Sequence, residues 1–423
     1  MKIGEFAKKH GVKISTVRYY IDNAMITPRR ENNQYILDET CDRQMEKILR
    51  LKNYRFKLSD IEKICFYENA TNLKDREVLK HLIRIFRDKE AKIKDDISEL
   101  QSILGLLESE IDRYREKLRN AEAAAESTVP IEALGIMCCP YCGKSLHISG
   151  AEIRDNGIYD AQISCRCGFS APVRSGMIVL PDAQNESPFR LFDNENLVLS
   201  SETDFSASYL LLLDKGHIDM YQNIDRIKED VRYVLCGPLS FSFILKNISM
   251  FSEDTVIFIN DISMEKIKKH MTYFSDLKQK VVYIAGDIRT VPLKKDSIDL
   301  YIDDFSIVNY IVPYNYNIAE KAAEFVRSGG YMAGLLVDYS KAPQTLAAFR
   351  EDHPEFIPGL LSTGRIKSVL SDAGFDISYI ENLGSSKTGE KNFARHSGNE
   401  TISLLSYMAK NLNHGLRKQK NST

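Results

Sequence analysis

The feature that most constrains this chain is an apolar repeat that runs over forty residues, from Leu79 to Leu118. Apolar side chains recur there at alternating steps of three and four, and only Glu90 interrupts the series. This spacing places them on one stripe of a helix with charged flanks, which is the pattern of a coiled-coil seam. The sequence therefore predicts a long helix that pairs with a second copy and makes a homodimer. The alternative is a helix that packs on its own chain's core. The repeat consists of Leu79, Ile83, Phe86, Ile93, Ile97, Leu100, Leu104, Leu107, Ile111, Tyr114 and Leu118.

The rest of the chain has the composition of a multidomain protein. A length of 423 residues is too great for one ordinary core, and 43% hydrophobic with 27% charged residues is typical of soluble proteins. No apolar run reaches the length of a membrane span, and the N-terminal "MKIGEFAKKHG" is charged where a signal peptide is apolar. We therefore expect a cytoplasmic protein without a membrane partner. Although the net charge is −2, residues 1–60 hold thirteen Lys and Arg against eight Asp and Glu, so a basic module precedes a neutral body.

Changes of periodicity predict a multidomain α and α/β chain. The expected parts are a winged helix-turn-helix domain over residues 1–70, a coiled-coil helix over 71–122, a zinc-ribbon-like domain over 130–185, a doubly wound sheet over 200–412 and a disordered tail over 413–423.

The first segment has the pattern of a helix-turn-helix. Its apolar residues point inward, the chain breaks at Gly11, and a second helix starts near Ile14. Short polar and planar groups on that helix suit a major groove, and the arginines after it suit a wing that contacts phosphates. The predicted DNA-binding residues are Ser15, Thr16, Arg18, Tyr19, Tyr20, Arg29, Arg30 and Tyr35. The alternative is a small helical domain whose arginines are merely solvated.

Residues 2–65 resemble the mercury-resistance-type (MerR) regulators in "IGEFAKKHGV", "TVRYY", the "PRR" wing entry and "FKLSDIEKI". The wing departs from the family because "NQYILDE" lacks its usual glycine and arginine. The resemblance implies an antiparallel helix contact in the dimer and a two-fold-symmetric site on double-stranded promoter DNA. It also implies that the regulator distorts promoter DNA, so that RNA polymerase is affected indirectly.

Four cysteines predict a metal site. Cys139 and Cys142 form one pair, and Cys165 and Cys167 form a second pair after 22 intervening residues. Two thiolate pairs on opposed turns can hold Zn²⁺ tetrahedrally. Four unrelated buried thiols or a disulfide are the alternatives, and His147 or Cys138 could replace a ligand because the second pair has one spacer residue. The segment "CPYCGKSLHI…CRCGFSAPVRSGMIVLPDA" with "ASYLLLLDKGHIDMYQNI" is similar to the zinc-ribbon start of the large-subunit ribosomal RNA guanine methyltransferase family.

Downstream, apolar runs that end in acidic residues or glycine alternate with helical segments, which predicts a doubly wound parallel sheet. "AGDIRTVPLKKDSIDLYI" and "FVRSGGYMAGLL" look like the class I S-adenosylmethionine-dependent methyltransferases. The resemblance implies a cofactor site at the carboxyl ends of the strands, with Asp261 and Asp287 at the ribose and adenine. The expected pocket lies between Gly237, Asp261, Asp287 and Phe305.

The first loop of that sheet, "CGPLSFSF", is poor in the glycines and lacks the acidic residue that the resemblance implies. Pro238 and Phe241 should fill space that glycines leave open, so we expect weak S-adenosylmethionine binding or none. No catalytic motif is recognisable near Asp303 and Asp304. The favoured hypothesis is a dimeric transcription regulator whose methyltransferase-like domain senses a small-molecule effector, such as a nucleoside or an antibiotic-like aromatic. The alternative is an active methyltransferase of RNA or a small molecule that regulates its own gene.

Overall fold

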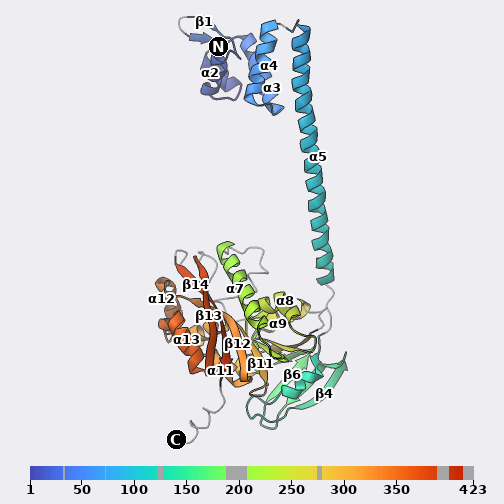
Figure 1. Cartoon of the computed structure of the whole chain (residues 1–423), viewed down its shortest axis with the longest axis vertical. Coiled ribbons are helices and arrows are strands. Elements are labelled where there is room, and N and C mark those ends of the chain that lie inside the picture. The colour runs from blue at the N-terminus through green and yellow to red at the C-terminus, as the bar shows by residue number, and fades with distance from the viewer. Residues whose placement is uncertain are drawn as a thin grey trace. The chain divides into compact units, whose positions relative to one another are not determined.

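The computed structural model of the chain describes residues 1–31, 34–71, 73–121, 127–186, 207–273, 279–387 and 400–412. The predicted tail, residues 413–423, lies outside them. The chain divides into two compact units, Met1–Leu118 and Arg119–Thr423, each with its own hydrophobic core (Figure 1). No helix in the described ranges is both long enough and apolar enough to cross a membrane.

The first unit begins with a winged helix-turn-helix. Gly11 has φ +64°, and this left-handed turn lets α2 pack across α1. Asp38 caps α3 by accepting hydrogen bonds from the N–H groups of Thr40 at 3.0 Å and Cys41 at 3.2 Å. Phe6 is among the core side chains that bring these elements together. The elements are α1 (Ile3–Lys9), α2 (Ile14–Asp22), β1 (Arg29–Glu31), β2 (Gln34–Ile36), α3 (Glu39–Asn53) and α4 (Leu58–Thr71).

Helix α5 (Arg76–Ala121) is a single helix of 46 residues, or roughly 70 Å at 1.5 Å per residue. It begins at Arg76 because the carboxylate of Asp75 accepts the N–H groups of Glu77 and Val78 at 2.8 and 3.0 Å. Its first turns pack on the helix-turn-helix core, where Leu82 is buried. Seven of its heptad residues further along are between 48% and 64% exposed: Ile97, Leu100, Leu104, Leu107, Ile111, Tyr114 and Leu118.

The second unit is built on one twelve-stranded sheet. The strands β8 to β12 are mutually parallel, whereas β14 runs antiparallel to both its neighbours, β12 and β13. Seven strands follow the spatial order β10-β9-β8-β11-β12-β14-β13. This order is that of a doubly wound sheet, as predicted. The strands are β8 (Tyr233–Cys236), β9 (Val256–Asp261), β10 (Lys280–Ala285), β11 (Ile298–Asp304), β12 (Val326–Asp338), β13 (Phe375–Lys387) and β14 (Thr401–Asn411).

Helices and short 3₁₀ turns link these strands. They are α7 (Ala207–Asp225), α8 (Phe241–Asn247), η2 (Ile248–Met250), α9 (Met264–Tyr273), η3 (Ile288–Thr290), α10 (Ser306–Tyr314), α11 (Ile318–Phe325), α12 (Pro343–Asp352), η4 (Pro358–Leu361) and α13 (Thr363–Asp372).

The cysteine-bearing segment joins the same sheet. Strand β7 lies parallel to β10, with Ile178 opposite Ile284, and the meander β7-β6-β5 continues the sheet from there. Buried residues of this segment belong to the same core as the doubly wound strands. The elements are β3 (Val129–Pro130), η1 (Ile131–Ile136), β4 (His147–Arg154), β5 (Gly157–Ser164), β6 (Ser170–Arg174) and β7 (Met177–Val179).

Candidate functional sites

The accessible face of α2 carries four of the eight residues predicted to contact DNA. Ser15, Arg18 and Tyr19 are exposed and Thr16 is half-buried. The Tyr19 hydroxyl donates to the carboxylate of Glu62 on α4 at 2.7 Å, which fixes the ring and raises the pKa of the tyrosine. The α2 face therefore presents a positioned aromatic ring and the exposed guanidinium of Arg18.

Tyr20 requires a correction. Its side chain is only 1% exposed, and it lies in the core of the first unit rather than on the face of α2. Helical geometry explains this, because Val17 and Tyr20 are three residues apart and share the buried face. Tyr20 supports the helix and is not available to a groove.

The wing arginines are exposed on β1. Arg30 lies opposite Tyr35 in the two-stranded ladder and donates to its hydroxyl at 2.6 Å, with the guanidinium 4.8 Å from the ring centroid. Arg29 lies 4.0 Å from Asp38, a contact that solvent screens. The structure thus brings the predicted wing residues together on one hairpin, and Tyr35 orients Arg30.

The four predicted cysteines converge. Their sulfur atoms all lie within 4.8 Å of one another, with Cys139 and Cys167 at 3.3 Å and Cys142 and Cys165 at 3.5 Å. A tetrahedral zinc site with Zn–S bonds near 2.3 Å requires sulfurs about 3.8 Å apart, so the donor set fits zinc. His147 and Cys138, the alternative ligands, lie outside this cluster.

Both cysteine pairs lie on tight turns that the sequence makes possible. The backbone carbonyl of Cys139 accepts the N–H of Gly143 at 2.9 Å, and the backbone carbonyl of Cys165 accepts the N–H of Gly168 at 3.0 Å. The two glycines have φ +69° and +101°. The N–H of Phe169 lowers the pKa of the Cys167 thiol to about 7, which favours the thiolate that binds metal.

The predicted cofactor carboxylates are both buried at the ends of their strands, and both already have partners within the chain. Asp287 accepts from the guanidinium of Arg289 at 2.9 and 2.5 Å and from the Tyr310 hydroxyl at 3.3 Å. Asp261 accepts the N–H of Ser263 at 2.8 Å. The paired carboxylate of Asp287 therefore has little capacity left for a ligand.

The segment after β7 covers these strand ends. The carboxylate of Asp182 accepts the N–H of Asp287 at 3.0 Å and the hydroxyl of Thr290 at 2.6 Å. A Cβ on Gly286 would lie 2.5 Å from the Cβ of Leu180, so this glycine allows the covering segment to approach the end of β10. Sequence reasoning missed this cover because no local pattern marks it.

Gly237 serves the packing of its own domain. A Cβ there would lie 2.4 Å from the Tyr301 hydroxyl and 2.7 Å from Ser306 Oγ. The following loop is fastened to the start of α10, because the Ser306 hydroxyl donates to the carbonyl of Pro238 at 2.8 Å. Leu239, with φ +73°, is buried, and so is Phe305. The predicted pocket residues therefore lie at one edge of the sheet, where the loop after Gly237 is bonded to Ser306 of α10.

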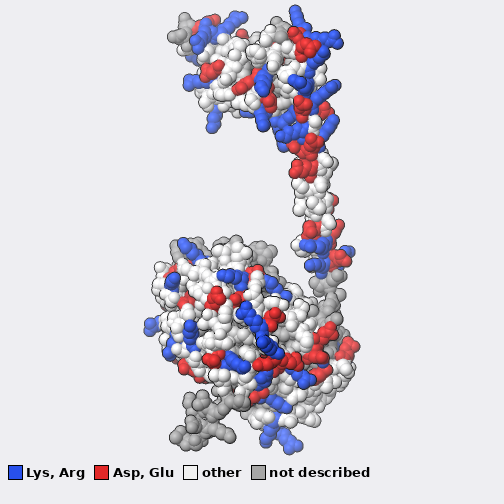
Figure 2. Space-filling view, in the orientation of Figure 1, with Lys and Arg blue, Asp and Glu red and all other residues white. Residues whose placement is uncertain are grey.

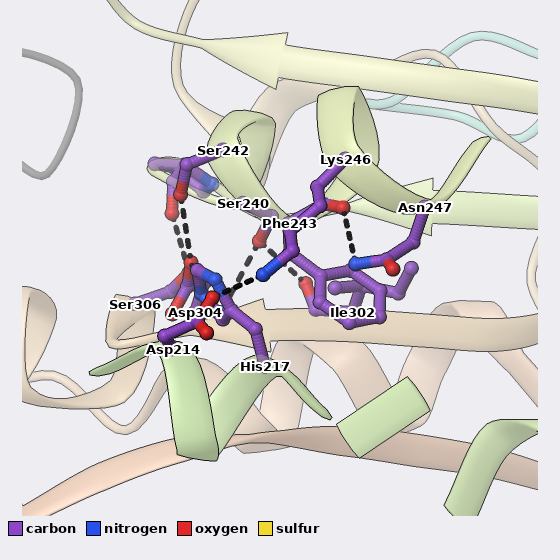
Figure 3. Close-up of polar contacts among 11 residues, drawn as sticks. Asp214, His217, Ser240, Ser242, Phe243, Lys246, Asn247, Ile302, Asp304 and Ser306 are labelled. Carbon is purple, nitrogen blue, oxygen red and sulfur yellow. Dashed lines mark hydrogen bonds and ion pairs between the residues drawn. The ribbon is translucent and has the colours of Figure 1, made fainter. Parts of the chain in front are cut away.

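A buried polar network that sequence reasoning missed lies beside this loop (Figure 3). His217 on α7 lies 3.0 Å from Asp304 at the end of β11, and Ser242 donates to the same carboxylate oxygen at 3.3 Å. Ser240 bridges the loop to β11 by donating to the carbonyl of Ile302 at 3.0 Å. A single histidine in an apolar helical segment gave little signal, because its partner is 87 residues away.

Next to it, Asp303 is fully buried and accepts the Tyr407 hydroxyl at 2.7 Å and the N–H of Ile307 at 3.2 Å. Burial raises the pKa of Asp303 to about 7. Asp303 and Asp304 thus link the end of β11 to other elements of the unit.

The fold and exposed residues of the first unit define a winged helix-turn-helix DNA-binding domain. More particularly, residues 1–67 match the family described as MerR HTH family regulatory protein, and this part of the chain is a MerR helix-turn-helix domain. No curated protein matches the chain.

Solved structures similar to the chain include S-adenosylmethionine-dependent methyltransferases. A geranyl diphosphate C-methyltransferase from Streptomyces coelicolor has 12% identity and a TM-score of 0.36, over 54% of this chain and 92% of that one. An arsenic(III) S-adenosylmethionine methyltransferase from Chlamydomonas reinhardtii has 14% identity and a TM-score of 0.34, over 44% of this chain and 65% of that one. The comparisons do not confirm the narrower resemblance to ribosomal RNA guanine methyltransferases.

Proposed function

We propose that the protein is a dimeric transcription regulator of the MerR type, in which a methyltransferase-like domain has become a ligand sensor. The observation that carries the proposal is the MerR domain with its exposed α2 face and wing, joined directly to the exposed apolar seam of α5. Two-fold pairing through that seam would present two recognition helices to a two-fold-symmetric DNA site.

The seam provides enough apolar surface for a stable dimer. Full burial of a large apolar side chain contributes roughly 1.5–3 kcal/mol, so seven half-exposed side chains from each of two chains contribute on the order of 10–20 kcal/mol. Association costs roughly 4–15 kcal/mol. Figure 2 shows an uncharged band along α5, where residues 100–107 contain no Lys, Arg, Asp or Glu. In this band, burial against a partner helix would remove the most apolar surface from water.

Two features favour a sensor over an enzyme for the second unit. The carboxylate of Asp287 is neutralised by Arg289, whose guanidinium also lies 5.4–5.9 Å from the ring centroids of Tyr310, Tyr314 and Tyr316. The loop after Gly237 carries Pro238, Leu239 and Ser240 where the resemblance implies further glycines, and Ser306 is bonded to the Pro238 carbonyl. We infer that S-adenosylmethionine binds weakly or not at all and that no methyl group is transferred. The zinc site would stabilise the fold that carries the sensor.

The test is selection of DNA from a random duplex library by the full-length protein, followed by affinity measurements on the selected sequence. Replacing Arg18 by Ala should weaken binding by roughly 1–3 kcal/mol if its guanidinium reaches a base edge. Lys92→Ala is the matched control, because it removes one exposed positive charge from α5 away from the wing. Selection of no sequence, or equal losses for both variants, would contradict the proposal. Labelled methyl transfer to RNA, DNA or a small molecule would instead support an enzyme.

A further inference from the structure

A second cavity, separate from the strand ends, lies between the cysteine-bearing segment and α9. It has a volume of about 530 Å³ and opens to solvent. Three methionines from two segments line it, Met177 on β7 and Met264 and Met271 on α9, together with the ring of Tyr159 on β5. Methionine side chains are flexible and polarisable, and they suit an aromatic guest.

The cavity has a positive rim. Arg174 at the end of β6 and Lys268 on α9 both line it, and none of its described lining residues is acidic. Neither cation takes part in a salt bridge between described residues. The guanidinium of Arg154 stacks on the ring of Tyr159, with its central carbon 3.6 Å from the ring centroid. The cavity thus combines an apolar, aromatic floor with two cations that lack an internal counter-charge.

The wall of this cavity includes the first described residue after the long helix. Ser127 lines the cavity, and a Cβ on Gly176 would lie only 2.0 Å from its carbonyl oxygen. A Cβ on Gly157 would likewise lie 2.2 Å from Thr128 Oγ1. Two glycines without side chains therefore let residues 127 and 128 lie flat on the cysteine-bearing strands. A guest in the cavity would contact Ser127, which follows the last residue of α5 by six positions in the sequence.

We infer that this cavity binds a small aromatic acid, a planar apolar body with one carboxylate or phosphate group, and that binding is transmitted through Ser127 to the long helix. The binding rests on the cavity alone, whereas the transmission rests on the proposed regulatory function. The apolar body contacts the methionines and Tyr159, and the acidic group pairs with Arg174 and Lys268.

The binding test uses calorimetry of the full chain with 1-naphthoate and 1-naphthyl phosphate, and with neutral 1-naphthalenemethanol as the reference compound. We expect at least one acid to bind at least tenfold more tightly than the alcohol, and Arg174→Gln to remove that preference. Lys269→Gln is the matched control, since it neutralises an exposed lysine on α9 that does not line the cavity. Absence of binding by both acids, or a preference for the acid that persists in Arg174→Gln, would overturn the site.

The transmission test measures the affinity of the full chain for its selected DNA with and without the tighter-binding acid. A shift is expected in the parent protein, with a reciprocal shift of acid affinity when DNA is bound. Arg174→Gln should lose this shift together with the preference for the acid, whereas Lys269→Gln should keep both. If acid binding depends on Arg174 while DNA affinity stays constant, the site stands and the transmission is refuted. If no DNA is selected at all, the regulatory proposal fails separately.

Discussion

The closest steric contact at the predicted cofactor loop gives a sharp prediction. In Gly237→Ala the new methyl would lie 2.4 Å from the Tyr301 hydroxyl and 2.7 Å from Ser306 Oγ, and Tyr301 is fully buried. Neither atom can move freely, so overpacking should cost about 1–3 kcal/mol. Tyr301→Phe removes the nearest atom and leaves the ring carbon Cζ at 3.0 Å. The double variant should therefore recover part of that cost, with a coupling energy on the order of 1 kcal/mol.

Hydrogen exchange read peptide by peptide in the full chain measures this cycle, with the peptides of β8 and β11 as the reporters. Gly359→Ala is the control, because a Cβ there meets no atom within 4 Å. A Gly237→Ala variant with unchanged exchange but lost S-adenosylmethionine binding would refute the reasoning, since it would show that the glycine is kept for a cofactor.

Three further predictions concern metal, assembly and pH. The protein should carry one zinc ion per chain by elemental analysis, and Cys139→Ser should lose it and lower the melting temperature; metal-free protein with four freely reactive thiols would argue against the site. Leu104→Asp, which buries a charge in the seam, should shift the mass measured by light scattering from dimer to monomer, whereas Lys94→Ala should not; a dimer in both would exclude the seam. Because burial raises the pKa of Asp303 to about 7, above its unfolded value near 3.9, its contribution to stability is full below about pH 4 and is lost as pH rises toward 7. The free energy of unfolding of the parent protein should therefore fall by up to about 4 kcal/mol between pH 4 and pH 7 through this group, and Asp303→Asn should remove that fall. Denaturant unfolding of both proteins at the two pH values measures it, and an equal dependence on pH in the two proteins would contradict the shift.

Periodicity and residue chemistry predicted the elements whose signals are local. The heptad repeat predicted α5, and its apolar residues from Ile97 to Leu118 are exposed. The spacing of the four cysteines predicted their convergence, since knuckle turns need only short-range geometry. Apolar runs followed by Asp261 and Asp287 predicted where these two strands end, at the carboxyl edge of the sheet.

Other features depend on contacts between distant residues, and the sequence carries no local sign of them. Asp182 meets Asp287 across 105 residues, and His217 meets Asp304 across 87. Tyr20 was assigned to the wrong face because a tyrosine suits a groove and a core equally well. The roles of such residues follow from tertiary packing rather than from propensity.

The pairing of β7 with β10 has a consequence for solubility. Strand β10 contains the apolar run "VVYIA", and β7 occupies the side of it that β9 does not. An uncovered strand of this kind is a template for the strands of other molecules. The cysteine-bearing segment therefore covers the backbone edge of β10 through β7. Protein that loses its fold around β7 should expose β10 and self-associate edge to edge.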